Sequence, residues 1–314
     1  MRYYPAPESA IMMPHLIEAV REAFIDHGNG SCEMPPKSYV TLPGGDFRTM
    51  PSYLPGLRIA GVKVVNVHPD NRTKGLPTVM GMIILLDPPS GKPVAILNAT
   101  ALTDLRTGAA AAVATEVLSS EKTGTLGIIG AGRQALSGLL AISEVFQVES
   151  VKVWSRNEKT ATRFTEKFPD LNITVTNLEQ ASDATVLLTA TPSTKSLIKD
   201  EWIADGTHIN AIGADAPGKQ ELDPNLLTRS QIFVDDRKQA VHSGEVNVPI
   251  RDGLLSAEDI TGTLGEVLIG KIGRSDPESV TIFDSTGIAI TDLAAASVAL
   301  QKGSFIELPY EHGF

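Results

Sequence analysis

The segment Thr125–Ala135 constrains the fold more than any other part of the chain. It reads TLGIIGAGRQA, in which a short apolar strand runs directly into Gly130-x-Gly132-x-x-Ala135 and then into a helical stretch. Gly130 permits a tight turn, Gly132 lets a backbone approach a pyrophosphate, and Ala135 allows a helix to pack closely on a strand. The N-terminus of the helix adds N–H groups and a favourable dipole. The segment therefore predicts a dinucleotide-binding site, whose turn also includes Ala131, Arg133 and Gln134.

Strands and helices alternate through residues 121–287, which is typical of a doubly wound parallel sheet, the Rossmann architecture. The polar break EKTG at residues 121–124 marks the start of this domain. We expect strands at 125–129, 151–154, 184–189, 208–212, 232–234 and 281–283, and helices at 134–145 and 158–168.

Residues 1–120 predict a second domain of mixed α+β structure. A helix is expected at residues 14–28, strands at 38–42, 59–67, 79–86 and 93–98, and an Ala-rich buried helix at 101–118. Turn signals between the strands favour a mixed, partly antiparallel sheet. The helix at 288–301 is apolar enough to pack back on this domain, so we expect residues 288–314 to complete it.

The residues after the second Rossmann strand bear on the choice of cofactor. An Asp or Glu there would accept a hydrogen bond from the ribose 2′-OH of NAD. This chain has Ser155-Arg156-Asn157 instead, a triplet that can hold a 2′-phosphate and contains no carboxylate to repel it. The triplet favours NADP. Arg156 could instead simply begin the next helix, in which case either NAD or NADP would bind.

Composition excludes several other classes of protein. The net charge of the 314 residues is −10 with no block of like charges, which disfavours a nucleic-acid surface. Cys32 is the single cysteine, so an internal disulfide and a cysteine metal cluster are both excluded. No signal pattern and no apolar run of about 20 residues is visible. We expect a cytoplasmic protein with no metal site and no membrane partner.

Four cations in the first domain require explanation. Lys63 lies in the middle of IAGVKVVNV, residues 59–67, which resembles a strand buried on both faces. Lys37, Arg48 and Arg106 also have mainly apolar or small neighbours. Each could direct its charge to water along the surface. Taken together, they predict a small anionic substrate, because a carboxylate needs fixed positive partners and Arg can bind it through two hydrogen bonds.

A carboxylate in the second domain lies where parallel sheets place their chemistry. Asp215 comes just past the carboxyl end of an apolar strand in INAIGADAPGKQELD. Its alternative role is capping, or a turn around Pro217-Gly218. His68 and His242 lie in turns or loops and have no partner at the spacing of a metal site.

Several long motifs together resemble the ornithine cyclodeaminase/mu-crystallin family, over nearly the whole chain. The matching pieces are FRTMP, GVKVVNVHPDN with GLPTV, TDLRTGAAAAVA, GIIGAGRQA, INAIGADAPGKQELD and FDSTGIAI. The resemblance implies a homodimer in which the N-terminal domain, joined by the C-terminal helix, forms the substrate pocket and the dimer interface. It also implies an enzyme; the family includes cyclodeaminases, alanine dehydrogenases, cyclic imine reductases and mu-crystallins.

Individual roles follow from the same resemblance. Lys63 and Asp215 match the family's catalytic lysine and aspartate, and Arg106 matches the arginine that holds the substrate carboxylate. Thr189 to Pro192, which includes Thr191, matches a segment beside the cofactor, and Ser285, Thr286 and Gly287 match the loop near the nicotinamide. Where ornithine cyclodeaminases tend to carry a Glu, this chain has Arg48, as alanine-dehydrogenase-like members do.

We therefore expect an NAD(P)-dependent oxidoreductase that interconverts a small L-amino acid, alanine first, with its oxo or imino acid, ammonia being a possible co-substrate. Arg48 and Arg106, with Lys37, would fix the carboxylate. Lys63, its pKa lowered by burial, would exchange a proton with the carbonyl or imine. The alternatives are reduction of cyclic imino acids such as pyrroline-2-carboxylate, ornithine cyclodeamination, and non-enzymatic binding of NADPH and a small ligand.

Overall fold

The structure, a computed structural model, describes residues 1–309 except for the side chain of Arg72. Its two compact units are Met1–Arg106 together with the chain from Ile288 on, and Thr107–Gly287. The polar break in the sequence predicts a division after residue 120. The units divide earlier, within helix α2 (Thr100–Leu118), because the second half of this helix joins the core of the second unit through Ala111.

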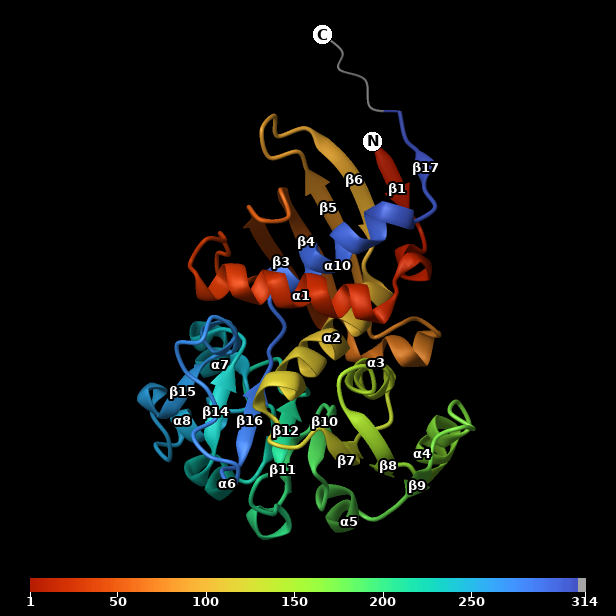
Figure 1. Ribbon diagram of the computed structural model, residues 1–314. Coiled ribbons are helices and arrows are strands. Elements are labelled where there is room, and N and C mark those ends of the chain that lie inside the picture. The colour runs from red at the N-terminus through yellow and green to blue at the C-terminus, as the bar shows by residue number, and fades with distance from the viewer. Residues whose placement is uncertain (310–314) are drawn as a thin grey trace. The chain divides into compact units, whose positions relative to one another are not determined.

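The first unit is built on one seven-stranded sheet. Its strand order is β17 (Ile306–Glu307), β1 (Arg2–Tyr4), β6 (Pro93–Asn98), β5 (Val79–Leu86), β4 (Ile59–Val67), β3 (Gly45–Leu54) and β2 (Ser38–Leu42). Only β1 and β6 pair in parallel; the other pairs are antiparallel. Helices α1 (Met13–Gly28) and α10 (Ala289–Lys302) pack against each other, and α10 also packs on β3, β4 and β5 (Figure 1). Short 3₁₀ helices lie at Pro7–Ala10 and Pro69–Lys74.

The two faces of this sheet differ in burial. Opposite residues on neighbouring strands share a face, so Met50, Lys63 and Ile83 point to one side, where all three are buried. On the other side Val64 is 36% and Met82 is 47% exposed. The expectation that residues 59–67 are buried on both faces is therefore wrong for the single chain: in the part of the chain that the structure describes, α10 packs on the sheet while Val64 and Met82 stay exposed.

The second unit contains an eight-stranded sheet in which every neighbouring pair is parallel. The strand order is β15 (Ile260–Thr263), β14 (Gln231–Val234), β16 (Thr281–Asp284), β12 (His208–Ala211), β10 (Val186–Thr189), β7 (Thr123–Ile129), β8 (Gln147–Trp154) and β9 (Ile173–Val175). A separate ladder joins β11 (Thr194–Ile198) to β13 (Gln220–Leu222). This confirms the predicted doubly wound sheet and the mixed second sheet.

Helices fill the connections between the parallel strands. They are α3 (Arg133–Ile142), α4 (Glu158–Thr165), α5 (Leu178–Ser182), α6 (Pro224–Arg229), α7 (Arg237–Ser243), α8 (Asn247–Arg251) and α9 (Leu264–Leu268), with 3₁₀ turns at Asp200–Trp202 and Ala257–Asp259. Apolar residues of α3 and α4 pack with β7, β8 and β10 into one core cluster. A second cluster is built from β10, β12, β14, β16 and α6.

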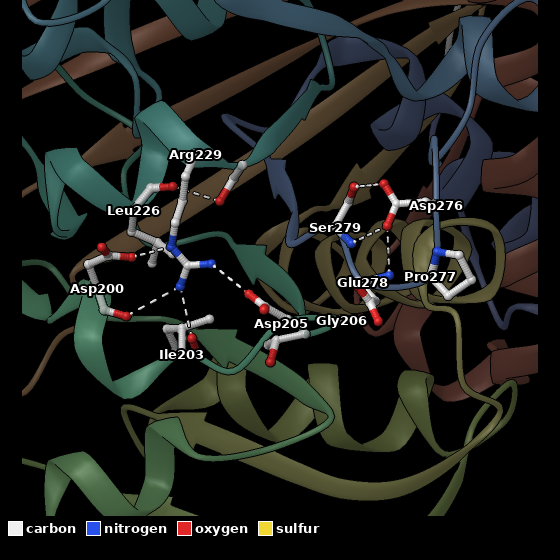
Figure 2. Close-up of polar contacts among 12 residues, drawn as sticks. Asp200, Ile203, Asp205, Gly206, Leu226, Arg229, Asp276, Pro277, Glu278 and Ser279 are labelled. Atoms are coloured by element: carbon white, nitrogen blue, oxygen red, sulfur yellow. Dashed lines mark hydrogen bonds and ion pairs between the residues drawn. The ribbon is translucent and has the colours of Figure 1, made fainter.

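Charged side chains fasten the loops that lead into the amino ends of the strands. Arg229 donates to the carboxylates of Asp200 and Asp205 and to the carbonyl of Ile203 at 2.8 Å, as Figure 2 shows. Close by in the same view, Asp276 accepts the backbone N–H groups of Glu278 and Ser279, just before β16. These contacts stabilise the amino edge of the sheet. Doubly wound sheets bind ligands at the opposite edge, beyond the carboxyl ends of the strands.

Candidate functional site

Lys63 lies on the buried face of β4 and does not reach water, since it is only 1% exposed. Its ammonium nitrogen is 2.7 Å from the carboxylate of Asp292, a residue of α10 in the same unit. An ammonium removed from water costs several kcal/mol unless it is paired and hydrogen-bonded. The sequence left open that the Lys63 ammonium reaches water at the surface, and the structure excludes this. The ammonium is instead paired with a buried carboxylate.

Arg106 shares the same carboxylate. Its Nε donates to Asp292 Oδ1 at 3.0 Å, and the arginine is 6% exposed. Asp292 lies in the first turn of α10, where the helix dipole stabilises a negative charge. Two buried cations thus face one carboxylate, so the cluster carries one excess positive charge whenever Lys63 is protonated.

Burial lowers the pKa of Lys63 to about 7, far below the usual value of 10.5 for a lysine. This value already includes the positive charges of Arg106 and Lys37, which lower the pKa, and the carboxylate of Asp292, which raises it. A lysine with a pKa near 7 can both donate and accept a proton at neutral pH, which is the property required of a general acid–base group.

Arg48 shares a sheet face with Lys63. Arg48 is paired with Val65 and Lys63 with Met50 across β3 and β4, which places the two cations two residues apart along the buried face. The Arg48 guanidinium donates to Asp46 Oδ1 at 2.8 Å and lies 5.3 Å from the centre of the Tyr39 ring. The first unit therefore brings Arg48 and Lys63 to one face of the sheet and Arg106 to the carboxylate that Lys63 contacts. Lys37, half-buried, acts electrostatically on Lys63.

The glycine turn of the second unit has the geometry that a dinucleotide needs. Gly130 adopts a positive φ of 103°, and its N–H donates to the carbonyl of Trp154 at 2.8 Å. A Cβ on Gly130 would lie 2.6 Å from the carbonyl oxygen of Ala190, so glycine is required there. A Cβ on Gly132, by contrast, would meet no atom within 4 Å and would point into open space before the first turn of α3. The residues present fit a bound pyrophosphate.

The triplet after β8 is only partly available for a cofactor. Arg156 is exposed, and Ser155 is half-buried. Asn157 caps helix α4 by accepting the N–H of Lys159 at 3.0 Å. The alternative in which Arg156 begins the next helix is wrong, because α4 begins at Glu158 with Asn157 as its cap, and Arg156 lies before the helix and remains accessible.

Two other predicted cofactor segments are held by buried carboxyl groups. Thr189 and Thr191 both donate to Glu221, at 2.8 and 2.7 Å. Ser285, Thr286 and Gly287 all donate to Asp235, at 3.2, 3.0 and 2.7 Å. Both carboxyl groups are buried at the carboxyl edge of the parallel sheet.

Asp215 is 38% exposed at its side chain and makes a short ion pair with Lys219 in the turn that follows β12. It is thus not buried, and its ion pair with Lys219 spans the turn at Pro217-Gly218 that the sequence left open as its alternative role. The turn continues through Gly218, whose N–H donates to Asn247 Oδ1 at 2.9 Å. Among the described residues no group of three or more His, Cys, Asp or Glu side chains is placed to hold a metal ion.

Reasoning from the sequence missed three acidic residues that organise these clusters: Asp292, Asp235 and Glu221. Asp292 carried a usable signal, since it is the only charged residue between residues 285 and 301 of an otherwise apolar, Ala-rich stretch. Asp235 directly follows a predicted strand. Glu221 carried no comparable signal, because it lies in a polar turn region and is buried only by the fold.

Comparisons with known proteins agree with this geometry. The sequence model of the ornithine cyclodeaminase/mu-crystallin family matches residues 4–303. An alanine dehydrogenase of Archaeoglobus fulgidus is 47% identical over 298 residues, 94% of this chain and 92% of that protein. A solved archaeal alanine dehydrogenase dimer with bound NAD superposes with a TM-score of 0.93 at 44% identity, covering 98% and 99% of the two chains. The Thermococcus litoralis Δ¹-pyrroline-2-carboxylate reductase, in complex with NADH and L-proline, superposes with a TM-score of 0.91 at 33% identity. The match covers 96% of this chain and 97% of that chain.

Proposed function

Since the chain belongs to the ornithine cyclodeaminase/mu-crystallin family, we propose that it interconverts L-alanine with pyruvate and ammonia. It is an NAD(P)-dependent oxidoreductase of amino and imino acids. The observation that carries the choice of a small carboxylate substrate is the buried cluster of Lys63, Arg106 and Asp292, which has one excess positive charge when Lys63, whose pKa is about 7, is protonated.

Within this proposal each residue has a definite task. Arg106 and Arg48, assisted by Lys37, bind and orient the substrate carboxylate through charge-assisted hydrogen bonds. Lys63 donates a proton to the carbonyl or imine during reduction and takes it back during oxidation. Asp215 moves a proton to or from the amine. When bound, the nicotinamide cofactor supplies or takes up the hydride at the substrate α-carbon.

Reduction of a cyclic imino acid is the second candidate. The Thermococcus litoralis relative bound to L-proline supports it. Such a substrate would use the same carboxylate-binding arginines and the same proton-transfer lysine without free ammonia. Ornithine cyclodeamination is disfavoured, because the Arg48 guanidinium would repel the distal ammonium of a diamine. A purely ligand-binding protein would not need both Lys63 and Asp215.

We also propose that the cofactor carries a 2′-phosphate. The relatives described above hold NAD or NADH, so a nicotinamide cofactor is common to them. Exposed Arg156 at the end of β8, with Ser155 beside it and no carboxylate in the triplet, supports NADPH for this chain.

The assembly we propose is a homodimer formed through the uncovered face of the seven-stranded sheet. Val40, Tyr53, Val64 and Met82 lie on four neighbouring strands and share this face, and they are 36–47% exposed. Contiguous apolar surface of this kind marks an interaction site. The archaeal alanine dehydrogenase is a dimer. No helix in the described part of the chain is long and apolar enough to cross a bilayer; we propose a cytoplasmic location, which the single cysteine suits.

One assay tests the proposed activity. The absorbance of NADH and of NADPH is followed with pyruvate plus ammonia, with pyrroline-2-carboxylate, and with ornithine. The proposal predicts fastest oxidation with pyruvate plus ammonia and a higher kcat/KM with NADPH than with NADH. Faster turnover of pyrroline-2-carboxylate would replace the first candidate by the second. Tight NADPH binding without turnover of any substrate would refute an enzymatic role.

A further inference from the structure

Glu221 in β13 has a fully buried carboxyl group that accepts three hydrogen bonds. Its Oε1 accepts the backbone N–H of Thr191 at 2.7 Å. Its Oε2 accepts the hydroxyl of Thr189 at 2.8 Å and the backbone N–H of Gly213 at 3.0 Å. One side chain therefore joins two loops that follow different strands of the parallel sheet, β10 and β12.

Both of these loops border the predicted chemistry of the second unit. The loop after β10 contains Ala190, whose carbonyl oxygen would be only 2.6 Å from a Cβ on Gly130 and therefore lies against the glycine turn. The loop after β12 contains Gly213, two residues before Asp215. Glu221 thus links the dinucleotide turn to the segment that carries the predicted proton-transfer aspartate.

Gly213 lies so close to Glu221 and to the Thr191 backbone that there is no room for a side chain at residue 213. A Cβ on Gly213 would lie 2.3 Å from Glu221 Oε2 and 2.4 Å from the carbonyl oxygen of Thr191. The second of these atoms belongs to the backbone and cannot move aside without moving its loop. Any side chain at residue 213 would therefore separate the two loops that Glu221 joins.

A buried carboxyl in this place is costly for the fold. Its negative charge acts on two other buried carboxyl groups, Glu245 and Asp284, and helps to raise the pKa of both. Burial raises the pKa of Glu221 to about 7. An apolar residue of similar size would avoid that cost, whereas a carboxyl retains two backbone N–H groups in fixed positions, as a preorganised ligand site requires.

We propose that Glu221 is a positioning residue, which fixes the Thr189–Thr191 loop and the Gly213–Asp215 segment in one arrangement and thereby sets both the affinity for the nicotinamide dinucleotide and the placement of Asp215. The part that concerns Asp215 rests on the proton-transfer role proposed above. The part that concerns affinity does not.

The test compares Glu221→Gln with Glu245→Gln. The two backbone N–H groups on Glu221 approach different oxygens, so an amide, with one acceptor oxygen, can keep only one of them. Glu245 accepts its two N–H groups, from Glu221 and Leu222, on the single atom Oε1, and its Oε2 has no hydrogen-bond partner among the described residues. Glu245→Gln therefore removes a buried carboxyl in the same region yet keeps both hydrogen bonds, which makes it the matched control.

For each variant the Kd for NADH is measured by fluorescence titration without substrate, together with the melting temperature and kcat at saturating cofactor. We expect Glu221→Gln to weaken NADH binding about tenfold and to lower kcat, because the variant loses one buried hydrogen bond to a backbone group. Glu245→Gln should bind NADH within about twofold of the unmodified protein. Gly213→Ala should reproduce the Glu221→Gln effect and serves if Glu221→Gln does not fold.

A purely structural role would lower the melting temperature and leave the Kd and kcat of the folded enzyme unchanged; that result would overturn the proposal, as would equal weakening by Glu245→Gln. Because NADH binding is read without turnover, a protein inactive on every amino and imino acid would refute the proposed function and still leave this test decisive.

Discussion

At the scale of single residues, Lys63 could be singled out from the sequence, but its pairing with Asp292 could not. An ammonium in the apolar run 59–67 is anomalous in any fold, and the residue is indeed 1% exposed. Asp292, which pairs with it, is 229 residues away along the chain. Only the packing of α10 on β4 brings the two together, and periodicity within a segment contains no information about contacts at that separation.

The pH dependence of turnover follows from this pair. Lys63, with a pKa of about 7, must be protonated to donate and neutral to accept. We therefore expect kcat/KM for reductive amination to fall as the pH rises through about 7, and kcat/KM for alanine oxidation to rise through the same range. Initial rates in both directions across neutral pH measure this.

Asp292→Asn supplies the control. Asp292 raises the pKa of Lys63, so replacing its carboxylate by a neutral amide should shift the pH dependence of kcat/KM to lower pH in both reaction directions. Ionisation of the substrates is the same for both enzymes, so the displacement between the two profiles reports on Lys63. Coincident profiles for Asp292→Asn and the unmodified protein would show that Lys63 is not the titrating group.

At the scale of elements, the strands with strong apolar runs could be predicted and those without them could not. The limits of β2, β4, β5 and β6 agree with the sequence, whereas β3 was missed because it begins at a Gly-Gly turn signal and contains Pro51. Proline is tolerated in β3 because the residues paired with β2 end at Thr49, so Pro51 lies beyond that ladder. The short strands β9, β11, β13 and β15 are formed by tertiary pairing with no local signal.

The turn between β7 and α3 gives a prediction at this scale. Gly132→Ala should weaken NADH binding about tenfold, since a methyl group would occupy the space through which a pyrophosphate approaches the backbone. The melting temperature should change little, because that methyl group meets no protein atom. Isothermal titration and thermal denaturation measure the two quantities.

Gly273→Ala is the control for this substitution. A methyl group at residue 273 would also meet open space, and the φ there is ordinary, but the residue lies in the loop before β16, at the amino edge of the sheet. This substitution should leave NADH binding unchanged. Equal binding by Gly132→Ala and the unmodified protein would argue against a pyrophosphate at this turn.

At the scale of the whole molecule, the sequence predicted two sheets of the correct kinds, and the apolar face left uncovered by helices emerged only from the structure. The apolar residues on both sides of β4 predict a strand that is buried on both faces, yet in the single chain Val64 is 36% exposed. The two observations agree if a second copy of the chain covers that face.

Met82→Lys tests this assembly. Met82 is 47% exposed, so the substitution should be tolerated by the fold, but a two-fold axis through the face would bring like charges together. Light scattering should give twice the 33.4 kDa chain mass for the unmodified protein and a single chain mass for the variant. Leu254→Lys, at an apolar residue 58% exposed in the other unit, should remain dimeric. A dimeric Met82→Lys would place the interface elsewhere.

The most direct test of the central claim, that a buried lysine performs proton transfer in an amino-acid oxidoreductase, is the kcat of Lys63→Met with pyruvate plus ammonia at saturating cofactor. Methionine fills the apolar surroundings of the lysine stem, and Asp292 keeps its contact with Arg106. The account predicts a fall of about 10² to 10⁴-fold in kcat with an unchanged Kd for the cofactor. Turnover equal to that of the unmodified protein would contradict it.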